Sequence, residues 1–264
     1  MFSRCLEVLA MLALMSASAV AADLRVCADP DNLPMSNDRQ EGFENRILQL
    51  VARDLDATLV YVWGNERRST ALEQLHKGRC DLVPGAIAGT TGIATTSPYM
   101  RSSYALVSRA EEGTFEGFDD PRLRRIRIGV QSVGDDAVTP PVEALLHRGL
   151  RANILPYTLH GNASDPNTAG GIVHAVATGE IDAAVLWGPF AGYYAARQAE
   201  PLKVTLVSSR ATEPPMSYAI SMALRPQDVA LRDAVDRALA KRRPDIATVL
   251  TEAHVPLLPL EVAQ

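Results

Sequence analysis

The hydrophobic pattern of residues 24–56 predicts a strand, a loop and a helix in succession. Residues 24–28 form a short apolar run, as in a buried strand, and residues 29–41 are polar. After Gly42 the apolar residues recur on one helical face: Phe43, Ile47, Leu48, Val51 and Leu55. A strand that leads into a helix places the intervening loop at the strand's carboxyl end, where open α/β sheets bind ligands.

The same alternation continues through the first half of the chain. Residues 59–63 are β-branched and aromatic, which predicts a second strand. A helix is expected from about Ser69 to Lys77, with Gly78 ending it, and a third strand over residues 80–86. Strands that alternate with helices in this way indicate a parallel sheet with right-handed crossovers.

The second half repeats this construction after a polar break at residues 109–120, so we expect two lobes. Further strands are predicted at 104–108, 126–130, 154–158, 204–207 and 218–224. Residues 70–86 and 168–189 each read as a helix, a glycine, an aspartate and an apolar strand. We expect residues 23–108 and 215–264 to form the first lobe and residues 109–214 the second, inserted through a two-segment hinge of the kind that closes around ligands.

Residues 1–22 have the composition of a secretory signal peptide. Arg4 precedes an apolar run at 8–15, and small residues follow up to Ala22. The run is shorter than the ~20 residues that a membrane span needs. In an exported protein the two remaining cysteines, Cys27 and Cys80, suggest a disulfide, with two buried thiols as the alternative.

Charge and motifs exclude several classes of function. The net charge is −5 and no basic run occurs, which argues against nucleic-acid binding, and no later segment could cross a bilayer. The chain lacks a Gly-x-Ser-x-Gly elbow, a Walker loop and a dinucleotide fingerprint. Its five histidines stand apart, without the spacing of a metal site. We therefore expect no catalytic residues, no metal and no cofactor.

Several side chains near strand ends have two interpretations. Trp63 and Trp187 each end a predicted strand, and each could line a cleft or belong to a core. Arg67 and Arg68 form either a solvated turn or an anchor for an acidic partner. Asp135, with its acidic neighbour, precedes a predicted helix, where capping or a solvated loop is the more ordinary role.

Motifs in both halves carry a resemblance to a known family. The segment LRVCADPDNLPMSNDRQEGFENRI resembles the start of type II periplasmic solute-binding proteins, whose two α/β lobes enclose a cleft. The set VCADPDNLPMSN, EGFENRI, RCDLVPG, TTSPYMRSSYALVSR, VGDDAVTPP and LWGPFAGYYA is similar to the MxaJ/XoxJ group within that superfamily. The group is associated with methanol dehydrogenases that use pyrroloquinoline quinone (PQQ).

The resemblance implies a periplasmic, non-enzymatic accessory protein. It would assist the maturation or activation of a PQQ-dependent methanol or alcohol dehydrogenase, a calcium or a lanthanide enzyme, or act with its cytochrome. Amino-acid-binding members of the superfamily hold their ligand with an arginine after the third strand and an aspartate at the end of a second-lobe strand. Here the loop 85–93 has no arginine, and Trp187 stands at the aspartate position. An amino acid's charges would therefore be desolvated without partners.

The alternative function is a substrate-binding protein that delivers a small solute other than an amino acid to an ABC permease. In either case we expect the ligand or partner to contact residues around the cleft. The candidates are Asn32, Pro34, Ser36, Trp63, Arg67, Arg68, Tyr99, Asp135, Trp187 and Pro189.

Overall fold

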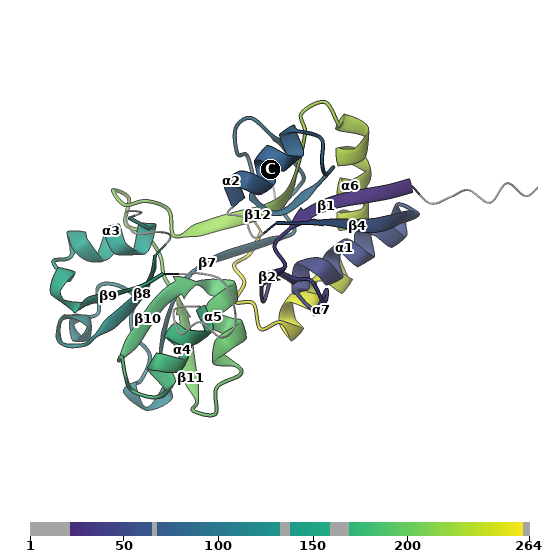
Figure 1. The fold of residues 1–264 in the computed structure, drawn as a ribbon. Helices are drawn as coiled ribbons and strands as arrows, with labels where there is room; N and C mark the ends of the chain where they lie inside the picture. Colours follow the sequence, from purple (N-terminus) through teal and green to yellow (C-terminus); the bar gives the residue numbers. More distant parts are fainter. Residues whose placement is uncertain (1–21, 65–67, 133–137, 159–168, 261–264) are drawn as a thin grey trace, which may run out of the picture.

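The computed structural model describes residues 22–64, 68–132, 138–158 and 169–260, and it confirms the two-lobed α/β architecture (Figure 1). In the first lobe, β1 (Ala22–Ala28) pairs in parallel with β4 (Ala57–Trp63). A parallel bridge between Val26 and Leu82 joins β1 to the chain entering β5 (Val83–Ile87). Next to β5 lies β12 (Ser217–Leu224), which is antiparallel. Strand β12 therefore shares a sheet with β5.

The helices of the first lobe cover this sheet. They are α1 (Phe43–Asp54), α2 (Arg68–His76), α6 (Val229–Lys241) and α7 (Arg243–Glu252). The apolar face predicted for α1 is buried, with Phe43, Ile47 and Leu48 almost inaccessible to solvent. Three two-residue strands complete the lobe: β2 (Asp31–Asn32), β3 (Ser36–Asn37) and β6 (Ala94–Thr95).

The second lobe is built around a sheet in which β10 (Ala183–Trp187) is parallel to β8 (Ile128–Ser132). On the far side of β8 lies β9 (Ile154–Thr158), also parallel. An antiparallel strand, β11 (Leu202–Leu206), pairs with β7. The helical segments of this lobe are α3 (Pro140–His147), α4 (Ala169–Ala177), α5 (Gly188–Ala195), and the 3-10 helices η1 (Ala110–Glu112), η2 (Pro121–Arg125) and η3 (Arg151–Asn153).

One long strand, β7 (Met100–Arg109), belongs to both sheets. Its residues 100–103 pair with β12, whereas its residues 104–109 pair with β10 and β11. Residues 104–108, which the sequence pattern assigned to the first lobe, therefore hydrogen-bond into the sheet of the second. The polar stretch at 109–120 lies beyond the point where the pairing changes, and the lobe limits at 108/109 and 214/215 stay a prediction.

Other predicted elements differ from the structure at their ends. The strand expected from Cys80 begins at Val83, because the amides of Asp81 and Leu82 turn to donate to the Arg25 carbonyl. The helix expected from Ser69 begins at Arg68. The sequence pattern predicted no helix over residues 188–195, where the structure has α5, although a proline in the first turn of a helix costs no hydrogen bond. The predicted signal peptide, apart from Ala22, lies outside the described residues.

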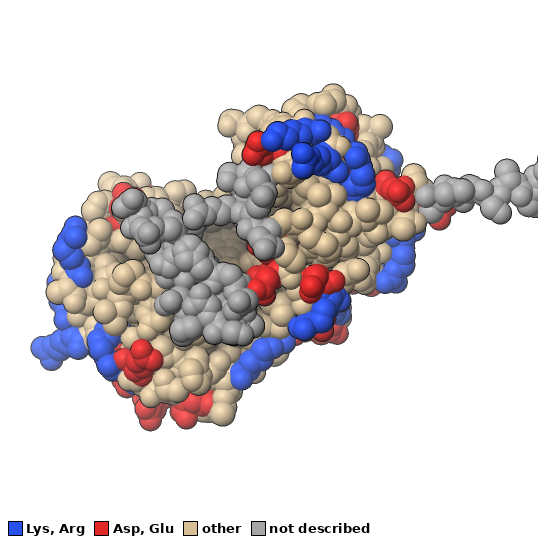
Figure 2. Space-filling model, viewed as in Figure 1, with Lys and Arg blue, Asp and Glu red and all other residues tan. Residues whose placement is uncertain are grey.

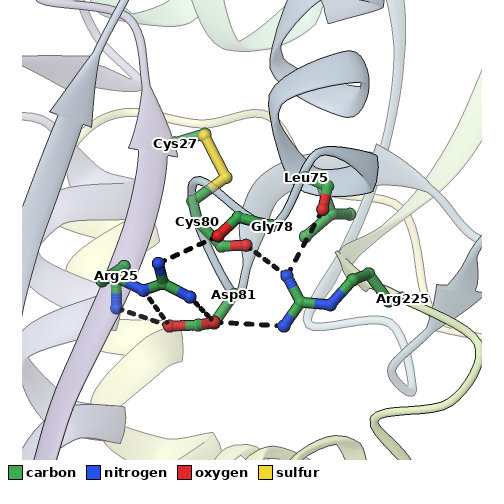
Figure 3. Close-up of a disulfide and its surroundings, with 7 residues drawn as sticks. All are labelled: Arg25, Cys27, Leu75, Gly78, Cys80, Asp81 and Arg225. Carbon is green, nitrogen blue, oxygen red and sulfur yellow. Dashed lines mark hydrogen bonds and ion pairs between the residues drawn. A yellow bond between two sulfur atoms is a disulfide. The ribbon is translucent and has the colours of Figure 1, made fainter.

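Each lobe contains an arginine–aspartate pair that holds the turn between a helix and the next strand. In the first lobe, Arg25 donates to Asp81 at 3.0 and 2.6 Å and to the Gly78 carbonyl at 2.9 Å (Figure 3). The buried disulfide between Cys27 and Cys80 lies beside this pair. The sequence had left open a disulfide or two thiols, and the structure has the disulfide.

The second lobe has the same arrangement without the disulfide. Arg127 donates to Asp182 at 3.0 and 2.9 Å and to the Gly179 carbonyl at 2.9 Å. At the position of the disulfide, Gly129 packs so closely on Ile181 that an added Cβ would lie 2.6 Å from its side chain. The weak sequence symmetry between the two halves therefore corresponds to a repeated set of hydrogen bonds.

Candidate functional site: the cleft between the lobes

The two sheets approach each other near the point where β7 and β12 pass between the lobes. Figure 2 shows a hollow in the surface between the lobes. The parallel strands β1 and β4 end at residues 28 and 63, and β10 ends at Trp187. Strand ends of this kind are where α/β folds place ligand-binding groups. We take the hollow as the candidate site.

Three aromatic rings cluster at the hinge. The register of β10 against β7 sets Trp187 opposite Tyr104, and their ring centroids lie 5.5 Å apart in an edge-to-face arrangement. Tyr218, at the start of β12, lies with its ring centroid 6.0 Å from that of Trp187. All three rings are half-buried, so they offer apolar and hydrogen-bonding contacts rather than charge.

The backbone of Trp187 is held from the neighbouring strand. Its amide donates to Oε1 of Gln131, on β8, at 3.0 Å, and the Gln131 side chain is almost fully buried. Trp187 is also the N-cap residue of α5. The indole is therefore positioned by three elements, because β8, β7 and α5 all contact this residue.

The first-lobe side of the site contains a buried carboxylate. Glu44 lies in the first turn of α1 and is 5 % exposed, and the Tyr99 hydroxyl donates to its Oε1 at 2.7 Å. Gly85 lies so close to the same oxygen that an added Cβ would be 2.9 Å from it. Tyr99, predicted to line the cleft, is 7 % exposed and points its hydroxyl at this carboxylate.

The loop after β1 is held by internal hydrogen bonds. The buried Ser36 hydroxyl donates to the Asp29 carbonyl at 2.8 Å, and Pro34 is buried. Asn32 ends β2 and remains half-exposed. Burial raises the pKa of the Asp29 carboxyl, although the Asp31 amide, which donates to it at 2.9 Å, partly offsets this. Of the three loop residues predicted for the site, Asn32 is the most accessible.

The remaining predicted site residues are dispersed. Trp63 stacks on Tyr61 along β4, with centroids 4.3 Å apart, and is half-buried. Pro189 is buried in the first turn of α5, beside Trp187. Arg67 and Asp135 lie outside the described residues, as does the side chain of Arg68, which begins α2.

Sequence reasoning missed four residues at this site: Tyr104, Tyr218, Gln131 and Glu44. Two of them had a signal, because Tyr104 and Tyr218 each open a predicted strand on the hinge side. Their meeting with Trp187 depends on the register of β7 against β10 and on its pairing with β12. Strand register between distant segments cannot be read from periodicity alone.

Helix α5 links the second lobe directly to the first. The Tyr194 hydroxyl donates to the Leu33 carbonyl at 3.1 Å, and burial raises the pKa of this phenol to about 12, so it stays protonated at neutral pH. A Cβ on Gly192 would lie 1.9 Å from the His254 carbonyl oxygen, and one on Gly188 would lie 2.4 Å from that of Ser103. The helix therefore packs backbone against backbone on the first lobe.

The segment that follows α7 runs past this contact. The Ser102 hydroxyl donates to the Pro256 carbonyl at 2.6 Å, and the Leu258 amide donates to the Arg101 carbonyl at 2.8 Å. Pro256 also lies against both glycines of α5. We call residues 254–258 the C-terminal strap, since they join the strand crossing the hinge to the helix beside the cleft.

Two side chains, Met35 and Trp187, pack against the hydrophobic cores of both lobes. The Ser103 hydroxyl, 1 % exposed, lies 2.6 Å from the Val207 carbonyl and 3.0 Å from that of Met216 at the crossing point. The arrangement of the lobes thus rests on apolar packing, on backbone contacts and on a buried hydroxyl.

The side chains described around the cleft offer groups for non-covalent binding. Within the part of the chain that the structure describes, no three His, Cys, Asp or Glu side chains gather as metal ligands. None of the described helices is long and apolar enough to cross a membrane. The aromatic rings, the Gln131 carboxamide and backbone groups can hold an apolar or weakly polar group.

Comparisons with known proteins agree with this architecture. Residues 24–249 match the family described as bacterial extracellular solute-binding proteins, family 3. The chain is 31% identical over 265 residues to protein MoxJ of Paracoccus denitrificans, covering 95% of each chain. The chain is also similar to two crystal structures, and each match covers the whole of the other chain. One is MxaJ from Methlophaga aminisulfidivorans MPT, with 28% identity, 89% of this chain covered and a TM-score of 0.75. The other is XoxJ, a periplasmic binding protein from Methylobacterium extorquens AM1, with 33% identity, 90% of this chain covered and a TM-score of 0.73.

Proposed function

We propose a function from the premise that this chain belongs to the family 3 bacterial extracellular solute-binding proteins and has the type II fold of that family. It is a periplasmic, non-enzymatic accessory protein of a PQQ-dependent methanol or alcohol dehydrogenase, and it assists maturation or activation of that enzyme. Its similarity to MoxJ, MxaJ and XoxJ over most of the chain supports this assignment.

The observation that carries the proposal is the character of the cleft. Trp187, whose ring lies near those of Tyr104 and Tyr218, stands where the resemblance to amino-acid-binding members of the superfamily implies a clamping aspartate. The loop 85–93 on the opposite lobe has no arginine. A zwitterion enclosed here would find no arginine in the loop 85–93 for its carboxylate and no carboxylate at position 187 for its ammonium group, and each unpaired charge would cost several kcal/mol. An apolar segment of a partner protein suits these rings better.

The contacts between the lobes also support docking rather than solute capture. Solute import depends on closure about a hinge. Here α5 and the C-terminal strap join the lobes through Tyr194, Gly192 and Gly188. Contacts of this kind oppose a change in the relative position of the lobes. A cleft held open by them would suit a partner that enters it from outside.

Calorimetric titration into the methanol dehydrogenase of the same organism, with and without quinone and metal, tests the proposal. Saturable binding is expected, and Trp187→Leu should weaken it about tenfold or more, as for a buried aromatic anchor. Trp63→Leu tests the other tryptophan predicted for the cleft, which lies at the end of β4 and stacks on Tyr61. No heat at tens of micromolar from folded protein would reject the proposal. A ligand screen by thermal stability would then test solute import.

A further inference from the structure

We propose that the outer end of the second lobe is a docking surface for an acidic patch on the protein partner. The surface consists of Arg124 and Arg125 on η2 and Arg151 on η3, and we call it the arginine end. The inference rests on the proposed function for the identity of the partner, but its evidence is independent of the cleft.

The three arginines are exposed and have no counter-charge. Among the described residues, none of the three forms an ion pair or a side-chain hydrogen bond, although four arginines nearby all do. Arginine side chains left without partners are available to carboxylates outside the chain, whose geometry the guanidinium fork matches.

The tertiary structure brings the three arginines to one place. Asn153, in η3, donates from Nδ2 to the carbonyl of Ile126, the residue after η2, at 2.9 Å. An added Cβ on Gly149 would lie 3.9 Å from Nη1 of Arg124, so this guanidinium extends over the turn before Arg151. Figure 2 shows Lys and Arg side chains at the end of this lobe that faces away from the first.

Three carboxylates of this region are already engaged. Asp120 is paired with Arg122 at 2.6 Å, and Asp119 accepts from Arg148 at 2.9 Å and also pairs with Arg210. Glu213 is buried against Arg148. These pairs surround a polar pocket of about 240 Å³ beside Arg124 and His147. Because each of these acids already has a guanidinium, none is left to neutralise the arginine end.

An acidic protein surface fits these observations better than an anionic membrane. Membrane-binding basic clusters commonly have about four to eight Lys or Arg. The arginine end has three, on a chain whose net charge is −5 and which would be repelled as a whole by anionic lipid. Arginine is enriched in protein interfaces, and a local charge opposite in sign to the rest of the molecule orients an approaching partner.

Charge reversal tests this inference. The variant Arg124→Glu/Arg125→Glu/Arg151→Glu is compared with Arg53→Glu/Arg237→Glu/Arg243→Glu. The second set is exposed, lies on the first lobe, forms no ion pair among the described residues and changes the net charge equally. Association rates with the dehydrogenase are measured by surface plasmon resonance between 50 and 300 mM salt. Reversal at the arginine end should slow association about tenfold or more at low salt and flatten its salt dependence.

The outcomes separate this inference from the proposed function. If the wild type binds and the first variant associates at the same rate, the docking surface is overturned and the accessory role still stands. The same holds if the control variant loses as much of its association rate as the first variant. No binding by folded wild-type protein overturns both. Vesicles containing anionic lipid are a further probe, because wild-type binding that only the first variant loses would assign the arginine end to a membrane instead. Circular dichroism melts confirm that each variant is folded.

Discussion

Arg225 and Arg109 make the same set of contacts in two different lobes. Nη1 of Arg225 donates to the carbonyls of Leu75 and Cys80 at 3.3 and 2.6 Å, and Nη2 lies 3.1 Å from Asp81 (Figure 3). The carbonyls belong to the end of α2 and to the turn that follows it. Arg225 stands immediately after β12, so the strand that returns to the first lobe ends on this turn.

In the second lobe, Arg109 ends β7 in the same way. Its Nη1 donates to the carbonyls of Val176 and Ile181 at 3.0 and 3.2 Å, and its Nη2 lies 4.0 Å from Asp182. Each strand that crosses the hinge thus ends at an arginine that contacts the end of a helix and the aspartate after it. These are α2 and Asp81 in the first lobe, and α4 and Asp182 in the second. The two halves share a construction that extends to these anchoring side chains.

Replacing either anchor with methionine should destabilise the protein. Arg225 and Arg109 have side chains only 15% and 13% exposed, and their loss removes the arginine donors to the carbonyls of Cys80 and Ile181. The expected loss is about 1–3 kcal/mol for each variant. Urea unfolding measures it. Arg39→Met, which removes a largely exposed ion pair with Glu41, should cost less than about 1 kcal/mol. Equal effects for all three variants would contradict the anchoring role.

Removing the disulfide should have a larger effect. Cys27 and Cys80 are separated by 53 residues, and closing a loop of that length corresponds to about 4 kcal/mol in the chain-entropy model. The variant Cys27→Ala/Cys80→Ala should therefore unfold at lower urea than the oxidised protein and resemble the reduced one. Ellman titration of the unfolded mature protein should find neither thiol free. Two free thiols would show that the bond does not form.

The packing of α5 on the C-terminal strap predicts intolerance at Gly192. Alanine there would bring a Cβ to 1.9 Å from the His254 carbonyl oxygen, so backbone must move. The expected destabilisation is about 1–3 kcal/mol, typical of overpacking, with a changed small-angle scattering profile as the lobes shift. Ala196→Ser, at the exposed end of the same helix, should change neither measurement. A neutral Gly192→Ala would contradict close packing between the lobes.

Acid should destabilise the protein through its paired carboxylates. Hydrogen bonds from Arg242 and Lys241 lower the pKa of Asp54 to about 2. A folded-state pKa below the unfolded value of about 3.9 means that the contribution is fully present above pH 4 and is lost as the pH falls toward 2. The midpoint of urea unfolding should fall over this range less steeply in Asp54→Asn than in the wild type.

The control for this pH profile is Asp38→Asn, since Asp38 is exposed and forms no ion pair among the described residues. Its profile should follow that of the wild type. Asp81 will contribute in the same direction: burial alone would raise its pKa, but hydrogen bonds from Arg25 and Arg225 outweigh burial and lower it. A wild-type stability that does not change between pH 4 and pH 2 would contradict the role given to these pairs.

Local pattern was enough for most of the elements. Strands β1, β4 and β10 and helix α1 were predicted from apolar periodicity, because each buries one face or a continuous run in a sheet core. Helix α5 was missed, since its Gly188–Pro189 start reads as a turn and its buried glycines face backbone rather than side chains. A helix that packs through glycines lacks large apolar side chains at its contact positions, so its sequence shows little hydrophobic periodicity.

The sequence by itself determined the two-lobed α/β class, the order of its elements and the family, because these depend on short-range periodicity and on motifs contiguous in the chain. It also showed that the loop 85–93 has no arginine and that a tryptophan stands at position 187, since single positions carry this information. Only the tertiary structure decided that Trp187 meets Tyr104 and Tyr218, that β7 belongs to both sheets and that η2 and η3, which carry three arginines, lie side by side. Each of these depends on register or packing between segments far apart in the chain, and local periodicity carries no information about such pairings.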